Sequence, residues 1–178
     1  MGRNAKIISK GNIGRVNILM ILVLLGTQSN SFVRLLDEIE NCIKNKIITD
    51  KVVVQCGHTR FSSDYMELLD FIPVKEFNSL IEKADLIITH GGVGSIINSI
   101  KAGKKIIAVP RLSKFNEHVN DHQIQIIQNL DKQGCIKGVL DVSLLPDAIK
   151  NIDEFIPKPY IGNKDGISKI VSDFIDNN

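Results

Sequence analysis

Short, continuously apolar runs alternate with longer amphipathic segments along most of the chain. The apolar runs lie at residues 20–25, 51–56, 86–88 and 106–109. The segments between them place apolar side chains three and four positions apart, as helices with one buried face do, at residues 32–43, 77–84, 93–102 and 120–130. Strands that are apolar throughout and separated by helices are typical of a parallel sheet covered on both faces. We therefore predict an α/β fold.

Further segments extend this pattern toward the C-terminus. Residues 66–71 are apolar but fit a helix or a strand equally well, and residues 136–139 predict a final short strand. Residues 157–160 form a stiff connector, because the residue before a proline resists helix. After it we predict an amphipathic helix with the apolar stripe Ile167, Ile170, Val171, Phe174 and Ile175. The chain thus divides into a domain at residues 20–156 and a connector with a terminal helix at residues 157–178.

The first 19 residues need a separate interpretation. Four basic residues precede an apolar run at residues 18–25, a combination that imitates a secretory signal. However, residues 26–30 offer no small-x-small cleavage site, and the run is too short to span a bilayer. A buried first strand that begins at Met20 explains the run better. We therefore interpret residues 1–19 as an extension or a mis-assigned start, and we predict no membrane-spanning segment.

Composition narrows the class of protein. The length of 178 residues suits one domain. The net charge of +2 argues against a dedicated nucleic-acid binder, which normally carries a strong basic excess. Cys42, Cys56 and Cys135 are odd in number and widely spaced. We therefore expect reduced, buried thiols in a cytosolic protein, with neither a disulfide frame nor a zinc site.

The strongest chemical signal follows the third apolar strand, where residues 89–95 read Thr-His-Gly-Gly-Val-Gly-Ser. Glycines let backbone N–H groups approach an oxyanion closely, and the start of a helix adds partial positive charge. This pattern predicts a phosphate-binding loop. It is neither the dinucleotide pattern, which fails at Ile97, nor a Walker loop, since residues 102–105 lack the required hydroxyl. The alternative is a tight strand-to-helix turn without a ligand.

A second polar cluster, at residues 117–123, follows the fourth apolar strand. Its side chains could recognise a sugar or a ribose by hydrogen bonds. His118 and His122 are four positions apart and suggest a metal pair, but no third ligand accompanies them. The other polar residues of the cluster are better explained as a hydrogen-bonding rim and a helix cap, namely Asn120, Asp121 and Gln123. Because the chain contains no Asp-x-Asp pair, we expect a site that needs no metal or other cofactor.

Three segments together resemble the C-terminal domain of family 28 glycosyltransferases: residues 89–95, residues 108–111 and residues 116–123. The resemblance covers about residues 20 to 150. It points to the small subunit of two-chain enzymes, such as the eukaryotic lipid-linked N-acetylglucosaminyltransferase. More closely, it points to the bacterial β-1,4-galactosyltransferases of capsule and exopolysaccharide synthesis. The resemblance implies a Rossmann-like domain equivalent to the C-terminal, donor-binding half of a GT-B fold, with a UDP-sugar as donor.

The resemblance also implies which residues contact the donor. Residues 26–28 match a first glycine loop that faces the phosphates, and residues 118–123 match a segment that reads the sugar and the nucleotide. One departure is Asn98, which stands where several relatives carry a glutamate that chelates the ribose hydroxyls. The implied contacts are Gly26, Thr27, Gln28, His90, Gly91, Gly92, Val93, Gly94, Ser95, Asn98, Arg111, His118, Asn120, His122 and Gln123.

A donor-binding half needs a second chain to hold the acceptor. We therefore expect the catalytic subunit of a two-component, inverting glycosyltransferase, held at the cytoplasmic face of the cell membrane by a membrane-anchored partner. The expected reaction moves a hexose, with galactose favoured, from a UDP-sugar to a polyprenyl-diphosphate-linked sugar. His90 and His118 are candidates for the catalytic base, although His90 could instead donate to a phosphate or stabilise its turn.

Other functions remain open at this point. The chain could be a UDP-N-acetylglucosamine transferase subunit or a non-catalytic regulator that binds nucleotide-sugars. A nicotinamide-dependent oxidoreductase is disfavoured, because residues 55–58, at the end of the second strand, contain no acidic residue to bind the ribose.

Overall fold

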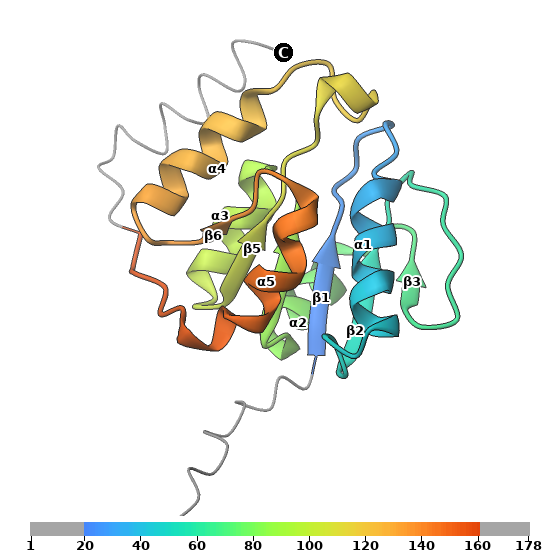
Figure 1. Cartoon of the computed structure of the whole chain (residues 1–178), viewed down its shortest axis with the longest axis horizontal. Helices are drawn as coiled ribbons and strands as arrows, with labels where there is room; N and C mark the ends of the chain where they lie inside the picture. The colour runs from blue at the N-terminus through green and yellow to red at the C-terminus, as the bar shows by residue number, and fades with distance from the viewer. Residues whose placement is uncertain (1–19, 161–178) are drawn as a thin grey trace, which may run out of the picture.

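A six-stranded parallel sheet forms the centre of the computed structural model, which describes residues 20–160 (Figure 1). Along the sheet the strand order is β3-β2-β1-β4-β5-β6, and every neighbouring pair is parallel. The strands are β1 (Met20–Leu24), β2 (Lys51–Gln55), β3 (Glu67–Leu69), β4 (Leu86–Thr89), β5 (Lys105–Ala108) and β6 (Lys137–Gly138). The predicted α/β, Rossmann-like fold is thereby confirmed.

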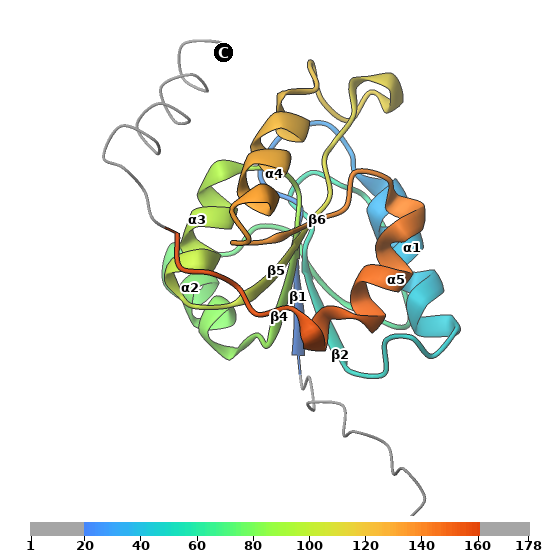
Figure 2. The ribbon, with the colours of Figure 1, turned by 60° about the vertical axis from the view of Figure 1, so that its left-hand side comes forward.

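Helices cover both faces of this sheet (Figure 2). The helices are α1 (Val33–Lys44), α2 (Val74–Lys83), α3 (Val93–Lys101), α4 (His122–Lys132) and α5 (Leu145–Lys150). Ile21 and Val23 of β1 pack in the core with α1 and α5, whereas Leu22 and Leu24 pack in the core with α2, α3 and α4. Successive side chains of a strand point to opposite faces, so a strand buried on both sides must be apolar throughout.

The order of the strands places a crevice beside β1. From β1 the chain builds outward through β2 and β3 on one side, and through β4, β5 and β6 on the other. Leu24, at the end of β1, pairs in register with Gln55 of β2 and with Thr89 of β4. The loops that leave these three strands therefore start at the same level. Parallel sheets bind ligands at such a switch point, outside the carboxyl ends of the strands.

Several boundaries differ from the predictions. The ambiguous segment at residues 66–71 contains the parallel edge strand β3, and α2 begins three residues earlier than predicted, at Val74. The predicted helix at residues 120–130 begins only at His122. Before it, the side chain of Asn120 accepts the backbone N–H of His122, and the carboxylate of Asp121 accepts the backbone N–H of Ser113. Such local side-chain bonds compete with helix formation.

The short helix α5 was not predicted at all. Its apolar residues Leu145, Ala148 and Ile149 are buried against α1, and Pro146 occupies its first turn, where proline is tolerated. Within residues 20–160, three 3-10 helices lie in the connections, at Ser113–Phe115, Val142–Leu144 and Ile152–Glu154. The predicted terminal helix and residues 1–19 lie outside the described residues.

The cysteines agree with the expected burial. Cys42, Cys56 and Cys135 are unpaired and buried, and burial raises the pKa of the Cys42 thiol to about 11. No helix within residues 20–160 is both long enough and apolar enough to cross a membrane.

Candidate functional site

A cavity of about 630 Å³ opens at the carboxyl ends of β1, β2 and β4. Its lining combines the backbone of two glycine loops with uncharged polar side chains and an apolar wall. The lining residues are Gly26, Thr27, Gln28, Gln55, Phe71, Ile72, Phe77, His90, Gly92, Val93, Gly94, Ser95, Ile97, Asn98 and Gln123. The cavity is therefore at the switch point of the sheet, where this class of fold binds ligands.

The second glycine loop ends in the bare N-terminus of α3. Gly92 occupies the N-cap position, no side chain caps the helix, and the bond from Ile96 N to Gly92 O begins the helical ladder. The first amides of a helix have no intrahelical acceptor. Those of Val93, Gly94 and Ser95 belong to residues that line the cavity. Three backbone donors and the positive end of the helix dipole make this the part of the cavity best suited to an anion.

The position of the His90 ring explains why residues 26 and 92 are glycines. A Cβ on Gly26 would lie 2.5 Å from His90 Cε1, and one on Gly92 would lie 2.2 Å from His90 Nε2. The ring therefore occupies the space that side chains at these positions would need. Nδ1 lies 3.2 Å from the carbonyl of Leu24, which can only accept, so Nδ1 carries the proton. Burial lowers the pKa of His90 to about 4, and the ring is neutral at physiological pH.

The first glycine loop is held by a side chain that the sequence analysis did not single out. The amide of Gln55 accepts the N–H of Gly26 at 3.2 Å and donates to its carbonyl at 3.1 Å. Both polar groups of the Gly26 backbone are thereby occupied. Thr27 and Gln28 are left as the residues of this loop whose amides could face a ligand.

The apolar wall of the cavity was also missed. It consists of Phe71 and Ile72, which follow β3, together with Phe77 of α2 and Ile97 of α3. The wall could have been found only if residues 66–71 had been recognised as a parallel strand, since its exit then lies at the same edge as the glycine loops. A planar apolar ligand such as a nucleobase suits this kind of surface.

Arg111 is buried beside the cavity and does not line it. Its guanidinium donates to the carbonyls of Leu25 and Asn30 at 2.7 Å each, and more weakly to that of Glu117 at 3.3 Å. Burial lowers its pKa to about 10, so the side chain remains charged at neutral pH. This geometry gives Arg111 a structural role, because it joins the exit of β1 to the segment after β5. Its contact with substrate stays a prediction.

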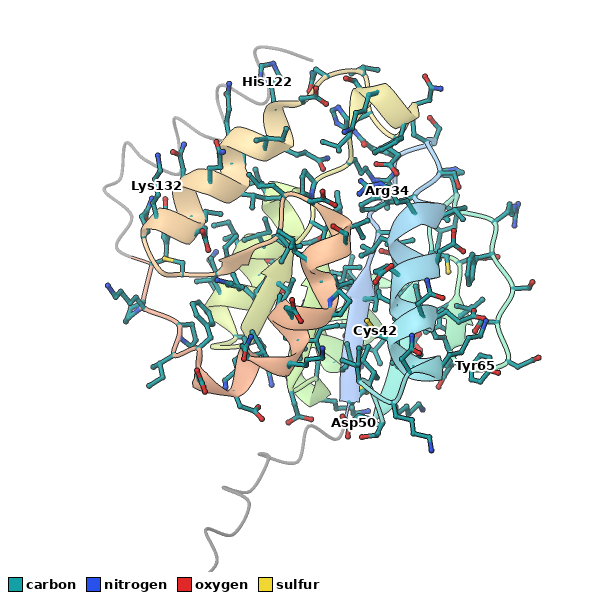
Figure 3. The ribbon with its side chains drawn as sticks, viewed as in Figure 1. Arg34, Cys42, Asp50, Tyr65, His122 and Lys132 are labelled. Atoms are coloured by element: carbon teal, nitrogen blue, oxygen red, sulfur yellow. The ribbon has the colours of Figure 1, made fainter. Side chains whose placement is uncertain are left out.

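An ion pair holds the same segment to α1. Arg34 donates from Nε and Nη2 to the two carboxylate oxygens of Glu117, at 2.9 and 2.8 Å. The guanidinium also lies over the exposed ring of Phe115, 4.8 Å from its centroid. Figure 3 shows Arg34 at the end of α1 nearest this loop, and His122 at the corresponding end of α4. The pair fixes the loop between β5 and α4 by a planar, bidentate contact.

His118 is tied to the first glycine loop and not to a metal. Its Nδ1 accepts the N–H of Asn120 at 3.2 Å, so Nε2 carries the ring proton. The structure places Gln28 Nε2 3.0 Å from His118 Nε2, where two donors would meet. With the amide turned by 180°, Gln28 Oε1, which is buried without a partner, accepts this proton. Burial lowers the pKa of His118, which keeps the ring neutral.

The suggested metal pair does not form. His118 precedes α4, whereas the exposed His122 is the first residue of that helix, so the two do not share a helix face. Within residues 20–160 no three His, Cys, Asp or Glu side chains gather in a way that could hold a metal ion. A site without a metal stays a prediction.

Gln123 is the part of the second polar cluster that reaches the cavity. Its Oε1 accepts the N–H groups of Arg111 and Gly91, at 2.9 and 3.2 Å. A Cβ on Gly91 would lie 2.5 Å from Gln123 Cβ, which explains the glycine there. With the amide oxygen held by two backbone donors, the amino group is the part of Gln123 that can serve a ligand.

The cavity thus gathers ten of the fifteen predicted contact residues. It does not include Gly91, Arg111, His118, Asn120 or His122. It adds five residues that were not predicted, namely Gln55, Phe71, Ile72, Phe77 and Ile97.

Known proteins with a similar sequence include two fungal relatives. One is the UDP-N-acetylglucosamine transferase subunit ALG13 of Debaryomyces hansenii, 28% identical over 99 residues, which are 55% of this chain and 45% of the relative. The protein of the same name from Kluyveromyces lactis is 32% identical over 101 residues, 57% of this chain and 41% of the relative. The chain therefore spans less than half the length of these relatives.

Solved structures share the fold at lower identity. The crystal structure of Acinetobacter baumannii MurG aligns with a TM-score of 0.56 and 17% identity, over 93% of this chain and 51% of that one. The NMR structure of ALG13 aligns with a TM-score of 0.54 and 15% identity, over 85% of this chain and 94% of that one.

A family model described as the glycosyltransferase family 28 C-terminal domain matches residues 20–177. This match extends over nearly the whole chain. The parallel sheet agrees with the fold of solved glycosyltransferases. One of them, described as the glycotransferase of kitacinnamycin, aligns with a TM-score of 0.52 and 20% identity, over 89% of this chain and 40% of that one. The chain therefore belongs to glycosyltransferase family 28 and carries the C-terminal domain of that family.

Proposed function

We propose that this chain is the donor-binding subunit of a two-component glycosyltransferase, and that its donor is UDP-N-acetylglucosamine. The observation that carries the proposal is the cavity at the switch point. Its lining brings together the free amides of residues 93–95 and an apolar wall. A diphosphate suits the first surface and a nucleobase the second, so one nucleotide can occupy both.

The sugar is assigned from the relatives. The resemblance seen in the sequence favours galactose and capsule or exopolysaccharide synthesis, with N-acetylglucosamine as the alternative. The curated relatives are named as UDP-N-acetylglucosamine transferase subunits, which supports the alternative better. In the cavity, the amino group of Gln123 and the side chain of Asn98 are two uncharged donors that suit sugar or ribose hydroxyls.

The acceptor side of the reaction is assigned to a partner. The relatives are named as subunits, and we propose that a membrane-anchored partner brings a lipid-linked saccharide to the cytoplasmic face of the membrane. Within this chain, catalysis consists of positioning the donor and stabilising the departing UDP by backbone amides. The reaction inverts the anomeric centre and uses no metal.

Neither candidate histidine is well placed to be the general base. His90 holds Leu24 through Nδ1, and its Nε2 lies against the backbone of the second glycine loop. Both ring nitrogens of His118 face residues of its own chain. A base must reach the acceptor hydroxyl directly or through one water. We therefore assign the base to the partner subunit.

Co-expression with the acceptor-binding partner tests this proposal. Purified complex is given labelled UDP-N-acetylglucosamine, UDP-galactose or UDP-glucose with a polyprenyl-diphosphate-linked sugar, with and without excess EDTA. We expect transfer from UDP-N-acetylglucosamine alone, unaffected by EDTA. Transfer of galactose would restore the earlier prediction of the sugar. Binding of UDP-sugars without transfer in any complex would instead favour a regulatory protein.

A further inference from the structure

The turn after β2 touches both sides of the cavity, although the predicted mechanism gives it no part. Gln55 is buried, with 4% of its surface exposed, at the end of β2. In addition to its two bonds with Gly26, its amide nitrogen lies 3.4 Å from the carbonyl of Asp70, the residue before Phe71. One side chain thus holds the first glycine loop and the start of the apolar wall.

Two backbone contacts strengthen the same connection. Cys56 N donates to Leu69 O at 2.7 Å, and Gly57 N donates to Asp70 O at 2.8 Å. Gly57 has φ +58°, and a Cβ there would lie 2.2 Å from the carbonyl oxygen of Gly26. Only glycine permits this conformation together with so close an approach of the two loops.

His58 adds a second link between the two sides. Its Nδ1 donates to the carbonyl of Thr27 at 3.1 Å. Its ring meets the ring of Phe71 edge to face, with the centroids 5.0 Å apart. Residues 55–58, which we call the β2 clamp, therefore bind the loop at residues 26–27 and the segment at residues 69–71 simultaneously.

We propose that Gln55 is a positioning residue, and that the β2 clamp sets the distance between the diphosphate-facing loops and the apolar wall. This inference rests on the proposed function. Both ends of the Gln55 amide are occupied by backbone groups, so the side chain acts on the ligand through the loops. A ligand that contacts only the wall does not depend on this distance. A ligand that must reach the wall and the loops at once does depend on it.

Uridine can serve as the ligand that contacts only the wall, and UDP as the ligand that must reach the wall and the loops at once. In Gln55→Glu an ionised carboxylate still accepts the N–H of Gly26 but repels the carbonyls of Gly26 and Asp70. We expect calorimetry at about pH 8 to show UDP binding at least tenfold weaker than in the wild type, with uridine binding within about twofold. Lowering the pH to about 5.5 should protonate the carboxyl, whose pKa burial raises, and let it donate to Gly26 as the amide does. The ratio of UDP affinities, variant to wild type, should then recover.

Two further variants accompany Gln55→Glu, one as a control for the added charge and one as a substitute. Gln125 is exposed on α4, so Gln125→Glu makes the same charge change away from the cavity and should match the wild type at both pH values. If Gln55→Glu does not fold, His58→Phe serves in its place, because it keeps a ring against Phe71 and loses only the bond to Thr27. It should weaken UDP by about threefold and leave uridine unchanged.

Three results would overturn the inference. The first is that Gln55→Glu weakens the binding of UDP and of uridine equally. The second is a loss of UDP affinity in Gln55→Glu that does not change with pH, and the third is a UDP affinity in His58→Phe equal to that of the wild type. A wild-type chain that binds uridine but gains nothing from the diphosphate would contradict the proposed function itself. The wild type and the variants therefore report on the two claims separately.

Discussion

The second glycine loop and the segment between β5 and α4 both looked like ligand-binding regions in the sequence, and the structure uses them in opposite ways. The loop leaves the amides of residues 93–95 free at the cavity. The segment at residues 111–122 directs its polar side chains to partners within the protein. Arg111 binds carbonyls, Glu117 binds Arg34, and Asp121 accepts from Ser113.

This difference shows that hydrogen-bonding capacity alone does not mark a binding site. A ligand needs groups that the fold has left without partners. A backbone N–H at a helix start is such a group, because geometry denies it an intrahelical acceptor. A polar side chain in a loop often satisfies the loop's own backbone first. The segment at residues 111–122 is therefore a support for the site, and Gln123, the residue that follows it in α4, lines the cavity.

The largest expected effect is on stability, and it tests whether Arg111 supports the site or contacts the ligand. Arg111→Met removes the donors to Leu25 and Asn30 and leaves buried carbonyls without partners. We expect urea unfolding to show a loss of about 3–5 kcal/mol in the free energy of unfolding, with UDP affinity per folded molecule nearly unchanged. Lys114→Met, at an exposed cation nearby, should change stability by less than about 0.5 kcal/mol. A stable Arg111→Met protein that no longer binds UDP would make Arg111 a ligand contact.

The buried ring of His90 should make stability depend on pH. Its folded pKa is about 4 against an ordinary value of 6.5, so the unfolded chain binds more protons between these values. The stabilisation is complete above pH 6.5 and is lost as the pH falls toward 4, by about 3 kcal/mol in all. Urea unfolding at several pH values measures the slope. His90→Gln should flatten it, and an identical slope in the variant would show that the ring titrates freely in the folded protein.

A charge at the start of α3 should weaken binding without harming the fold. A Cβ on Gly94 meets nothing within 4 Å, so a side chain fits there. We expect Gly94→Asp to weaken UDP by about a hundredfold, or about 2.7 kcal/mol, because the carboxylate repels the diphosphate. Thermal unfolding should be unchanged or slightly raised, since an acidic residue suits a helix N-terminus. Gly94→Asn is the uncharged control, and an equal loss in both variants would mean that bulk, not charge, is responsible.

The smallest effect belongs to a residue that the sequence had placed in the site. His122 is exposed, and only its backbone N–H takes part in the bond to Asn120. His122→Ala should change UDP-sugar affinity by less than about 0.5 kcal/mol, whereas Gln123→Ala should cost about 1 kcal/mol or more. Calorimetry with UDP-N-acetylglucosamine makes the comparison. A larger loss for His122→Ala would return the exposed histidine to the site.

Particular residues show how far the sequence could lead. The continuous apolar strands fixed the parallel sheet, and the glycines at residues 91–94 marked the loop that lines the cavity. Phe71 and Gln55 could not be assigned, because their roles depend on how the exits of β2 and β3 meet. The partners of Arg111 and His118 within the protein could not be assigned either, for a related reason. Three of these partners, Leu25, Gln28 and Asn30, lie about 80 to 90 positions away in the chain, and no local pattern reveals them.

Backbone amide shifts measured by NMR during titration with UDP, and separately with uridine, test the central claim most directly. The account predicts that the diphosphate adds its largest shifts at Val93, Gly94 and Ser95, with smaller ones at Thr27 and Gln28, while both ligands shift Phe71 and Ile72. Residues 112–121 should change little. If the diphosphate instead shifts those residues most and leaves the start of α3 unmoved, the anion lies on the β5–α4 segment and the assignment of the site is wrong.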